Sequence, residues 1–224
     1  MDRRAVIFDV DGVLVDSYQA HFEAWRALGR QLGRDLTEER FAASFGRRNP
    51  ELMADLWDGA VPADQVDHWS DWKERTYREI LLKRFPAMDG AVELLDALKA
   101  AGFAVAIGSS GPPENVACAA EGLGRAAAFD ATVNGFEVAC GKPDPEVFLK
   151  AASKLGIAPA RCAVVEDALA GIEAADRAGM TPIGLTGTTT RQRLARTAAL
   201  VVDSLRDLTP GRIAALIDAR GPGA

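Results

Sequence analysis

The chain has 224 residues, 48% of them hydrophobic, which is enough for one large domain or one domain with an insertion. Its formal net charge is −6 and it has no basic block, which argues against a nucleic-acid partner. The sequence has no apolar segment of signal-peptide length near its start and no run of about 18 apolar residues. We therefore expect a cytoplasmic protein without a membrane span.

Short apolar runs recur along most of the chain and predict strands at 5–8, 103–107, 131–133, 162–165, 182–185 and 200–202. Helical patterns lie between most of them, and those at 91–102 and 145–156 end at a glycine. Strands that alternate with helices indicate a parallel sheet covered on both faces. The sequence thus predicts an α/β fold with a Rossmann-like parallel sheet as its core.

Residues 17–86 interrupt this alternation. Phe22, Trp25, Leu28 and Leu32 are spaced like one face of a helix, and further helical patterns follow without a strand-like run. All four tryptophans and both histidines of the chain lie in this segment. We expect residues 17–86 to form a helical cap domain inserted into a catalytic core made of residues 1–16 and 87–224.

Polar residues follow four of the apolar runs, or the loops after them: Asp9-Val10-Asp11-Gly12, Ser109-Ser110-Gly111, Lys142 and Glu166-Asp167. Taken singly, each acid is more simply explained as a helix cap and the lysine as a solvated loop residue. Ligands of parallel α/β sheets, however, bind at the carboxyl ends of the strands. Four such signals at that edge therefore favour a functional site.

The residue types in these positions indicate phosphate chemistry. Asp9 and Asp11 are two apart on an extended segment, so both side chains point the same way, and clustering them with Asp167 is costly unless a cation balances the charge. The candidate ligands are all oxygen atoms, with no histidine or cysteine among them, and such a set favours Mg²⁺. Lys142 adds a positive charge and Ser109 a hydroxyl, which together suit phosphoryl transfer. One aspartate can attack phosphorus and form an aspartyl-phosphate, while the other acts as general acid and then base.

These motifs, in this order, resemble the four motifs of the haloacid dehalogenase superfamily. The first motif reads Asp9-x-Asp11-Gly12-x-Leu14-x-Asp16-Ser17, and the others contain Ser109, Lys142-Pro143 and Glu166-Asp167. Residues 164–180, VVEDALAGIEAADRAGM, are similar to the branch that contains phosphoglycolate phosphatases and beta-phosphoglucomutases. The match covers nearly the whole chain.

The resemblance implies roles for individual residues. Asp9 would be the nucleophile and Asp11 the general acid and base, while Ser109, Ser110 and Lys142 would bind the phosphoryl group. The implied Mg²⁺ ligands are Asp9, the backbone carbonyl of Asp11 and Asp167. Glu166 would be a further ligand or would contact one of the ligands. True dehalogenases of the superfamily lack the second aspartate, so Asp11 argues for phosphate chemistry.

Hydrolase and mutase are both open on these motifs. His21 and Lys73 match the mutase pattern of a histidine and a lysine that reach the site from the cap, and Arg48 is either a ligand for a substrate anion or a solvated arginine. The mutases usually read Ser-x-Ser-Lys-Asn after the second strand, whereas this chain has prolines at 112 and 113. We expect a monomeric phosphatase for a small phosphorylated metabolite, such as a sugar phosphate or phosphoglycolate, with a beta-phosphoglucomutase as the alternative.

Two other classes fit less well. A dinucleotide-binding oxidoreductase requires Gly-x-Gly-x-x-Gly after the first strand, where this chain has Asp-Val-Asp-Gly. A binding protein that had lost catalysis would be expected to lack Asp9 or Asp11, and both are present. The three cysteines form no C-x-x-C pair and are expected to be unpaired thiols.

Overall fold

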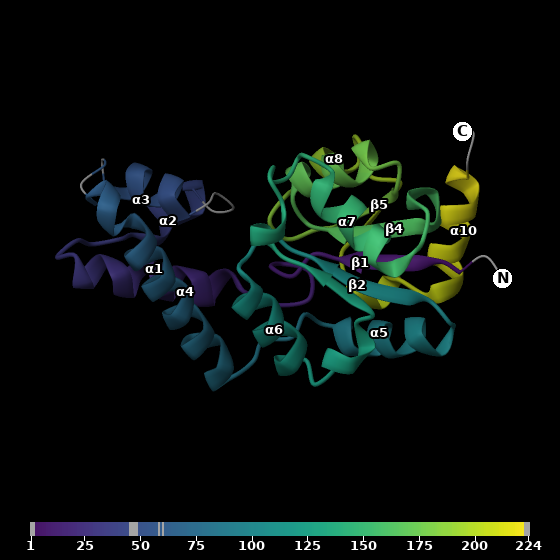
Figure 1. The fold of residues 1–224 in the computed structure, drawn as a ribbon, viewed down its shortest axis with the longest axis horizontal. Helices are drawn as coiled ribbons and strands as arrows, with labels where there is room; N and C mark the ends of the chain where they lie inside the picture. Colours follow the sequence, from purple (N-terminus) through teal and green to yellow (C-terminus); the bar gives the residue numbers. More distant parts are fainter. Residues whose placement is uncertain (1–2, 45–48, 58, 60, 222–224) are drawn as a thin grey trace. The chain divides into compact units, whose positions relative to one another are not determined.

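A computed structural model describes residues 3–44, 49–57, 59 and 61–221 (Figure 1). The chain divides into two compact units. The core unit comprises Met1–Asp16 and Pro86–Ala224, and the helical unit comprises Ser17–Phe85. Each is described by itself below.

The core unit is built on a six-stranded parallel sheet with the strand order β3-β2-β1-β4-β5-β6. The strands are β1 (Ala5–Phe8), β2 (Ala104–Gly108), β3 (Ala131–Val133), β4 (Cys162–Glu166), β5 (Thr181–Leu185) and β6 (Leu200–Val202). Strand β1 lies between β2 and β4, with Ile7 paired to Ala106 on one side and to Val164 on the other. The predicted α/β class and parallel sheet are confirmed.

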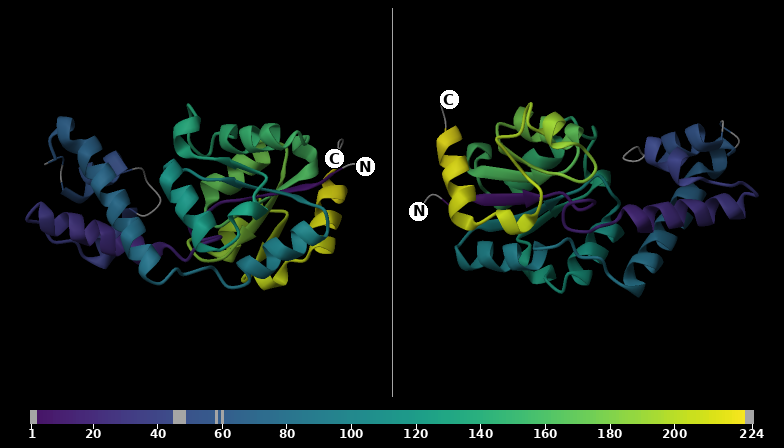
Figure 2. Two further views of the ribbon diagram at one scale, coloured as in Figure 1. Left: turned by 60° about the horizontal axis from the view of Figure 1, so that its bottom comes forward. Right: turned by 180° about the vertical axis from the view of Figure 1, so that it is seen from behind.

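Helices cover both faces of this sheet (Figures 1 and 2). They are α5 (Ala91–Ala100), α6 (Pro113–Gly122), α7 (Glu146–Leu155), α8 (Leu169–Arg177), α9 (Arg191–Leu194) and α10 (Pro210–Arg220). Helices α7 and α8 pack on one face, and α5 and α10 pack on the other. All four residues of β1 are buried because apolar side chains meet them from both faces.

The ends of α7 follow from local sequence. The carboxylate of Asp144 accepts a hydrogen bond from the backbone N of Glu146 at 2.9 Å, which satisfies one of the first helical N–H groups. Gly156 ends the helix in the left-handed region, at φ 65°. The helix starts at Glu146, one residue after the start of the pattern predicted at 145–156.

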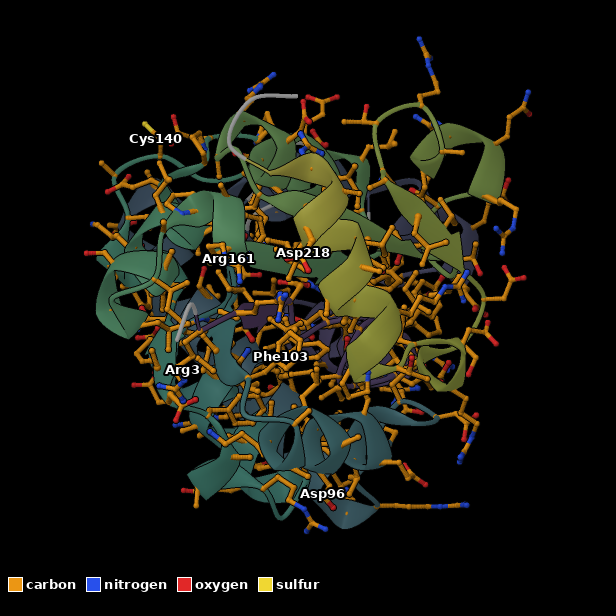
Figure 3. The ribbon with its side chains drawn as sticks, turned by 90° about the vertical axis from the view of Figure 1, so that its right-hand side faces the viewer. Arg3, Asp96, Phe103, Cys140, Arg161 and Asp218 are labelled. Atoms are coloured by element: carbon orange, nitrogen blue, oxygen red, sulfur yellow. The ribbon has the colours of Figure 1, made fainter. Side chains whose placement is uncertain are left out.

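Helix α10 is tied to the amino-terminal edge of the sheet by ion pairs. Asp218 accepts hydrogen bonds from Arg4, which directly precedes β1, at 3.0 and 2.6 Å. It also accepts one from Arg161 at 2.9 Å, and Figure 3 shows Arg161 beside Asp218 of α10. The four polar motifs follow the carboxyl ends of the strands, away from this contact, so the contact serves the fold.

The helical unit contains α1 (Tyr18–Gln31), α2 (Glu38–Ser44), α3 (Asn49–Trp57) and α4 (Val66–Lys83), preceded by a 3₁₀ turn at Ala63–Gln65. Helix α1 packs along α4. The predicted face of α1 is buried in the core of this unit, where Phe22, Trp25 and Leu28 meet Phe41 and Trp57. Aromatic packing therefore gives these residues their own hydrophobic core.

The three cysteines are free thiols, with Cys118 and Cys162 buried and Cys140 exposed. Within the described ranges, none of the helices combines the length and apolar character that crossing a membrane requires.

Candidate active site

The candidate site lies at the carboxyl edge of the sheet. Asp9 follows β1, Ser109 follows β2, and Glu166 is the last residue of β4. Since β1 is paired to both neighbours, the ends of these three strands are adjacent, and the backbone N of Asp9 donates to the carbonyl of Val165 at 3.1 Å. The strand order thus brings together residues more than 150 positions apart in sequence.

Three buried acids form a cluster at this edge. Carboxylate oxygens of Asp9, Glu166 and Asp167 lie within 4.8 Å of one another. Lys142 joins the cluster: its Nζ donates to Asp9 Oδ1 and to Glu166 Oε1, both at 2.7 Å. The same ammonium lies over the ring of Phe148, 4.9 Å from its centroid, in a cation–π contact. The predicted convergence of these four residues is therefore observed.

Burial and mutual repulsion govern the ionisation of this cluster. Burial raises the pKa of Asp9 to about 7, although the charge of Lys142 opposes the shift. Burial and then the charges of Glu166 and Asp9 raise the pKa of Asp167 well above its ordinary value. Burial alone would lower the pKa of Lys142, but Asp9 and Glu166 outweigh it and the net shift is upward.

The donor set fits a divalent cation. When ionised, three carboxylates and one ammonium leave two negative charges in a buried site. A divalent cation would balance that charge, and the all-oxygen donors of Asp9, Glu166 and Asp167 are those that Mg²⁺ prefers.

Two glycines make room for the acids. Gly12 has φ +77°, and a Cβ added there would lie 2.1 Å from Asp167 Oδ2. A Cβ added at Gly171, in helix α8, would lie 1.8 Å from Glu166 Oε1. The backbone therefore approaches both carboxylates more closely than any residue with a side chain would allow.

The loop after β2 places the hydroxyl of Ser109 at the carboxyl ends of the strands, where the acid cluster lies. Ser109 is buried, and its Oγ accepts a hydrogen bond from the backbone N of Gly111 at 3.0 Å, which leaves the hydroxyl proton to be donated elsewhere. Ser110 is exposed. Asp11 is half-buried, and its charge contributes to the raised pKa of Asp9.

The comparisons with known proteins agree with this geometry. A model of the haloacid dehalogenase-like hydrolase family matches residues 3–179, which include all four motifs. The chain belongs to this family. The predicted membership and the prediction of a phosphatase-type hydrolase of the superfamily are both confirmed.

Relatives of this hydrolase include both activities considered above. It is 34% identical to a validoxylamine A 7'-phosphate phosphatase from Streptomyces hygroscopicus subsp. limoneus, over 93% of this chain and 96% of the relative. It is also 34% identical to the beta-phosphoglucomutase of Bacillus subtilis, over 81% and 83%. A solved hydrolase of family IA, variant 3, from Entamoeba histolytica has a TM-score of 0.87 at 29% identity, covering 96% of this chain and 99% of that one.

One polar contact of the hydrolase was missed by sequence reasoning. The hydroxyl of Thr188, in the loop after β5, donates to Asp167 Oδ2. The run Thr186–Arg191 contains no nucleophile–base pair that would indicate a site. Nothing in its residue pattern indicates which threonine returns to the acid cluster.

The cap residues predicted for substrate binding lie in the helical unit. Lys73 Nζ is 2.9 Å from His21 Nδ1 and donates to Glu74 Oε1 at 2.9 Å, and both His21 and Lys73 are buried. The His21 ring stacks on Tyr77 at 3.9 Å between centroids. Arg48 lies outside the described residues. Contact of these residues with a substrate stays a prediction.

Proposed function

We propose that this hydrolase is a Mg²⁺-dependent phosphomonoester hydrolase that acts on a small phosphorylated metabolite, such as a sugar phosphate, through an aspartyl-phosphate on Asp9. The observation that carries the proposal is the buried cluster of Asp9, Glu166 and Asp167 with Lys142 paired to two of them. The validoxylamine A 7'-phosphate phosphatase and the beta-phosphoglucomutase, each 34% identical to this chain, both have names that refer to phosphorylated compounds, which supports the substrate class.

The first half-reaction would form the aspartyl-phosphate. An oxygen of Asp9 attacks phosphorus, the bond from phosphorus to the ester oxygen breaks, and Asp11 gives its proton to the departing alkoxide. Lys142 and the hydroxyl of Ser109 bind the phosphoryl oxygens on which charge develops. Asp9, Glu166 and Asp167, with the carbonyl of Asp11, would hold Mg²⁺, which supplies positive charge to the phosphoryl group when bound.

The second half-reaction would return the enzyme to its starting state. Asp11, now ionised, takes a proton from a water molecule as the water oxygen attacks phosphorus. The bond from phosphorus to Asp9 breaks and inorganic phosphate leaves. Residues 17–85 would act as a cap that excludes bulk water during both steps and carries the substrate contacts of His21 and Lys73.

The raised pKa of Asp9 fits this cycle. Burial raises the pKa of Asp9 when no cation is present, which works against the charged form of its carboxylate. A divalent cation next to it would favour the charged form, which is the form that attacks phosphorus. Cation binding and activation of the nucleophile would therefore be coupled.

A mutase is the second candidate, because the buried pair of His21 and Lys73 matches the mutase pattern and because a beta-phosphoglucomutase is equally similar in sequence. The loop after Ser109 argues against it. Pro112 precedes helix α6 as its N-cap residue and Pro113 is the first residue of the helix, and neither provides a side-chain donor for a second phosphate. We therefore favour the hydrolase.

A Mg²⁺-dependent assay with two arms tests the proposal. One arm measures phosphate release from a panel of phosphomonoesters that includes phosphoglycolate and sugar phosphates. The other measures glucose 6-phosphate formation from β-glucose 1-phosphate with a bisphosphate primer. The proposal predicts phosphate release without isomerisation, abolished by excess chelator. Isomerisation faster than hydrolysis would show that the enzyme is a mutase. Full activity in excess chelator would show that the reaction does not depend on Mg²⁺.

A further inference from the structure

Thr188 contacts the acid cluster from a loop that belongs to none of the family motifs quoted above. Its hydroxyl donates to Oδ2 of Asp167, although Thr188 is an exposed residue. The carboxylate of Asp167 is itself buried, with 3% of the residue exposed. The hydroxyl of Thr188 therefore connects an exposed loop to a buried carboxylate.

The loop that carries Thr188 is held on both sides. The backbone N of Thr186 donates to the carbonyl of Val202 at 2.9 Å, and its hydroxyl donates to Asp203 at 2.8 Å. Arg191, at the start of α9, donates to the carbonyl of Val201 at 2.8 Å. These contacts with and just after β6 fix the loop independently of Asp167, so the loop can position the carboxylate rather than follow it.

Gly12 packs against the same carboxylate oxygen. The position of a Cβ at Gly12 lies only 2.1 Å from Asp167 Oδ2, so this oxygen sits against the backbone of the first motif. With Gly12 on one side and the Thr188 hydroxyl bonded to it, Oδ2 is held in place. The other oxygen, Oδ1, is left for a cation.

From these contacts we propose that Thr188 is a positioning residue, which holds Asp167 in the orientation that a divalent cation requires. The inference rests on the metal site of the proposed function. Mg²⁺ demands near-ideal octahedral geometry, so a ligand that can rotate binds it less tightly than a ligand held by a fixed partner. Thr188 would thus affect affinity for the cation without touching the cation or the substrate.

The test is a calorimetric titration of the full chain with Mg²⁺ alone, without substrate. Thr188→Val removes the hydroxyl at nearly constant volume, and we expect about tenfold weaker Mg²⁺ binding, at the low end of what partners of metal ligands contribute. Thr188→Ser keeps the hydroxyl and should bind as the wild type does. Thr190→Val is the matched control, because Thr190 lies in the same loop and makes no side-chain cap bond.

A second readout is the rise in melting temperature that Mg²⁺ produces, which should follow the same order among the variants. Thr188→Val also removes a hydrogen bond to the buried carboxylate of Asp167, so each rise is measured from that variant's own metal-free melting temperature. Thr188→Ala offers a second test of the same contact. Wild-type Mg²⁺ affinity in both variants would overturn the role of Thr188 alone. A wild type that binds no Mg²⁺ would overturn both this inference and the proposed metal dependence.

Discussion

Gly171 offers a substitution in which intrinsic helix preference and the geometry of the site predict opposite results. It is a buried residue of helix α8, and alanine at a helix interior is favoured over glycine by about 1 kcal/mol. A Cβ at this position, however, would lie 1.8 Å from Oε1 and 2.0 Å from Cδ of Glu166. No pair of unbonded atoms tolerates such a distance, so Glu166 would have to move.

The cost of moving Glu166 is set by its hydrogen bonds. Oε1 accepts from Lys142 Nζ at 2.7 Å and Oε2 accepts from the backbone N of Ala168 at 2.8 Å. Hydrogen bonds to charged groups contribute about 1.5–3 kcal/mol each, so losing even one exceeds the gain in helix preference. Losing both gives an expected net destabilisation of about 2 kcal/mol or more for Gly171→Ala.

Denaturant unfolding in the presence of chelator measures this change directly. Gly211→Ala is the control, since Gly211 lies in helix α10 and a Cβ there would meet nothing within 4 Å. That variant should be as stable as the wild type or more stable by up to about 1 kcal/mol. Gly171→Ala should also bind Mg²⁺ more weakly. Stability equal to or above that of the wild type, with unchanged Mg²⁺ affinity, would refute the close packing of Gly171 on Glu166.

Three further predictions concern the charged groups. Burial raises the pKa of Asp9 from 3.8 to about 7 in the folded protein, so the native state binds this proton more tightly than the unfolded chain does. The free energy of unfolding without metal should therefore fall as the pH rises from about 4 to about 7. Denaturation across this pH range should show a shallower fall in Asp9→Asn, and an identical slope would contradict the shift. Lys142→Met should abolish turnover and lower metal-free stability by about 3–5 kcal/mol, since Asp9 and Glu166 lose their buried partner; unchanged unfolding would contradict this. Lys73→Met should cost about 1–3 kcal/mol in unfolding measurements because His21 and Glu74 both lose their ammonium partner. A neutral effect would show that the contacts of Lys73 contribute nothing to the stability of the helical unit.

The sequence predicted the fold and the acid cluster because both depend on local, repeated signals. Apolar runs such as Val6–Phe8 and Val164–Val165 have no polar alternation, and a strand buried on both faces requires that pattern. Asp9, Lys142 and Glu166 follow such runs or the loops after them, and the carboxyl ends of parallel strands share one edge. Their convergence therefore follows from the α/β class itself.

The contacts that escaped prediction depend on the exact path of the backbone. Nothing in the run TGTTTR distinguishes Thr188 from its neighbours, and its bond to Asp167 follows from how the loop is fixed to β6. In the sequence, nothing distinguishes Gly171 from any other glycine in a helix. Only the position of the Glu166 side chain shows why no Cβ fits there. Both contacts depend on distances in three dimensions that the residue pattern does not indicate.

The central claim is that phosphate passes through Asp9. It is tested most directly by quenching the enzyme with acid during turnover of its best substrate with Mg²⁺, and locating phosphate on its peptides by mass spectrometry. The account predicts a phosphorylated Asp9 that forms within the first turnover, is lost as phosphate is released, and is absent in Asp9→Asn, which should be folded and inactive. Normal turnover with no phosphate on Asp9, or with phosphate on Asp11 instead, would contradict it.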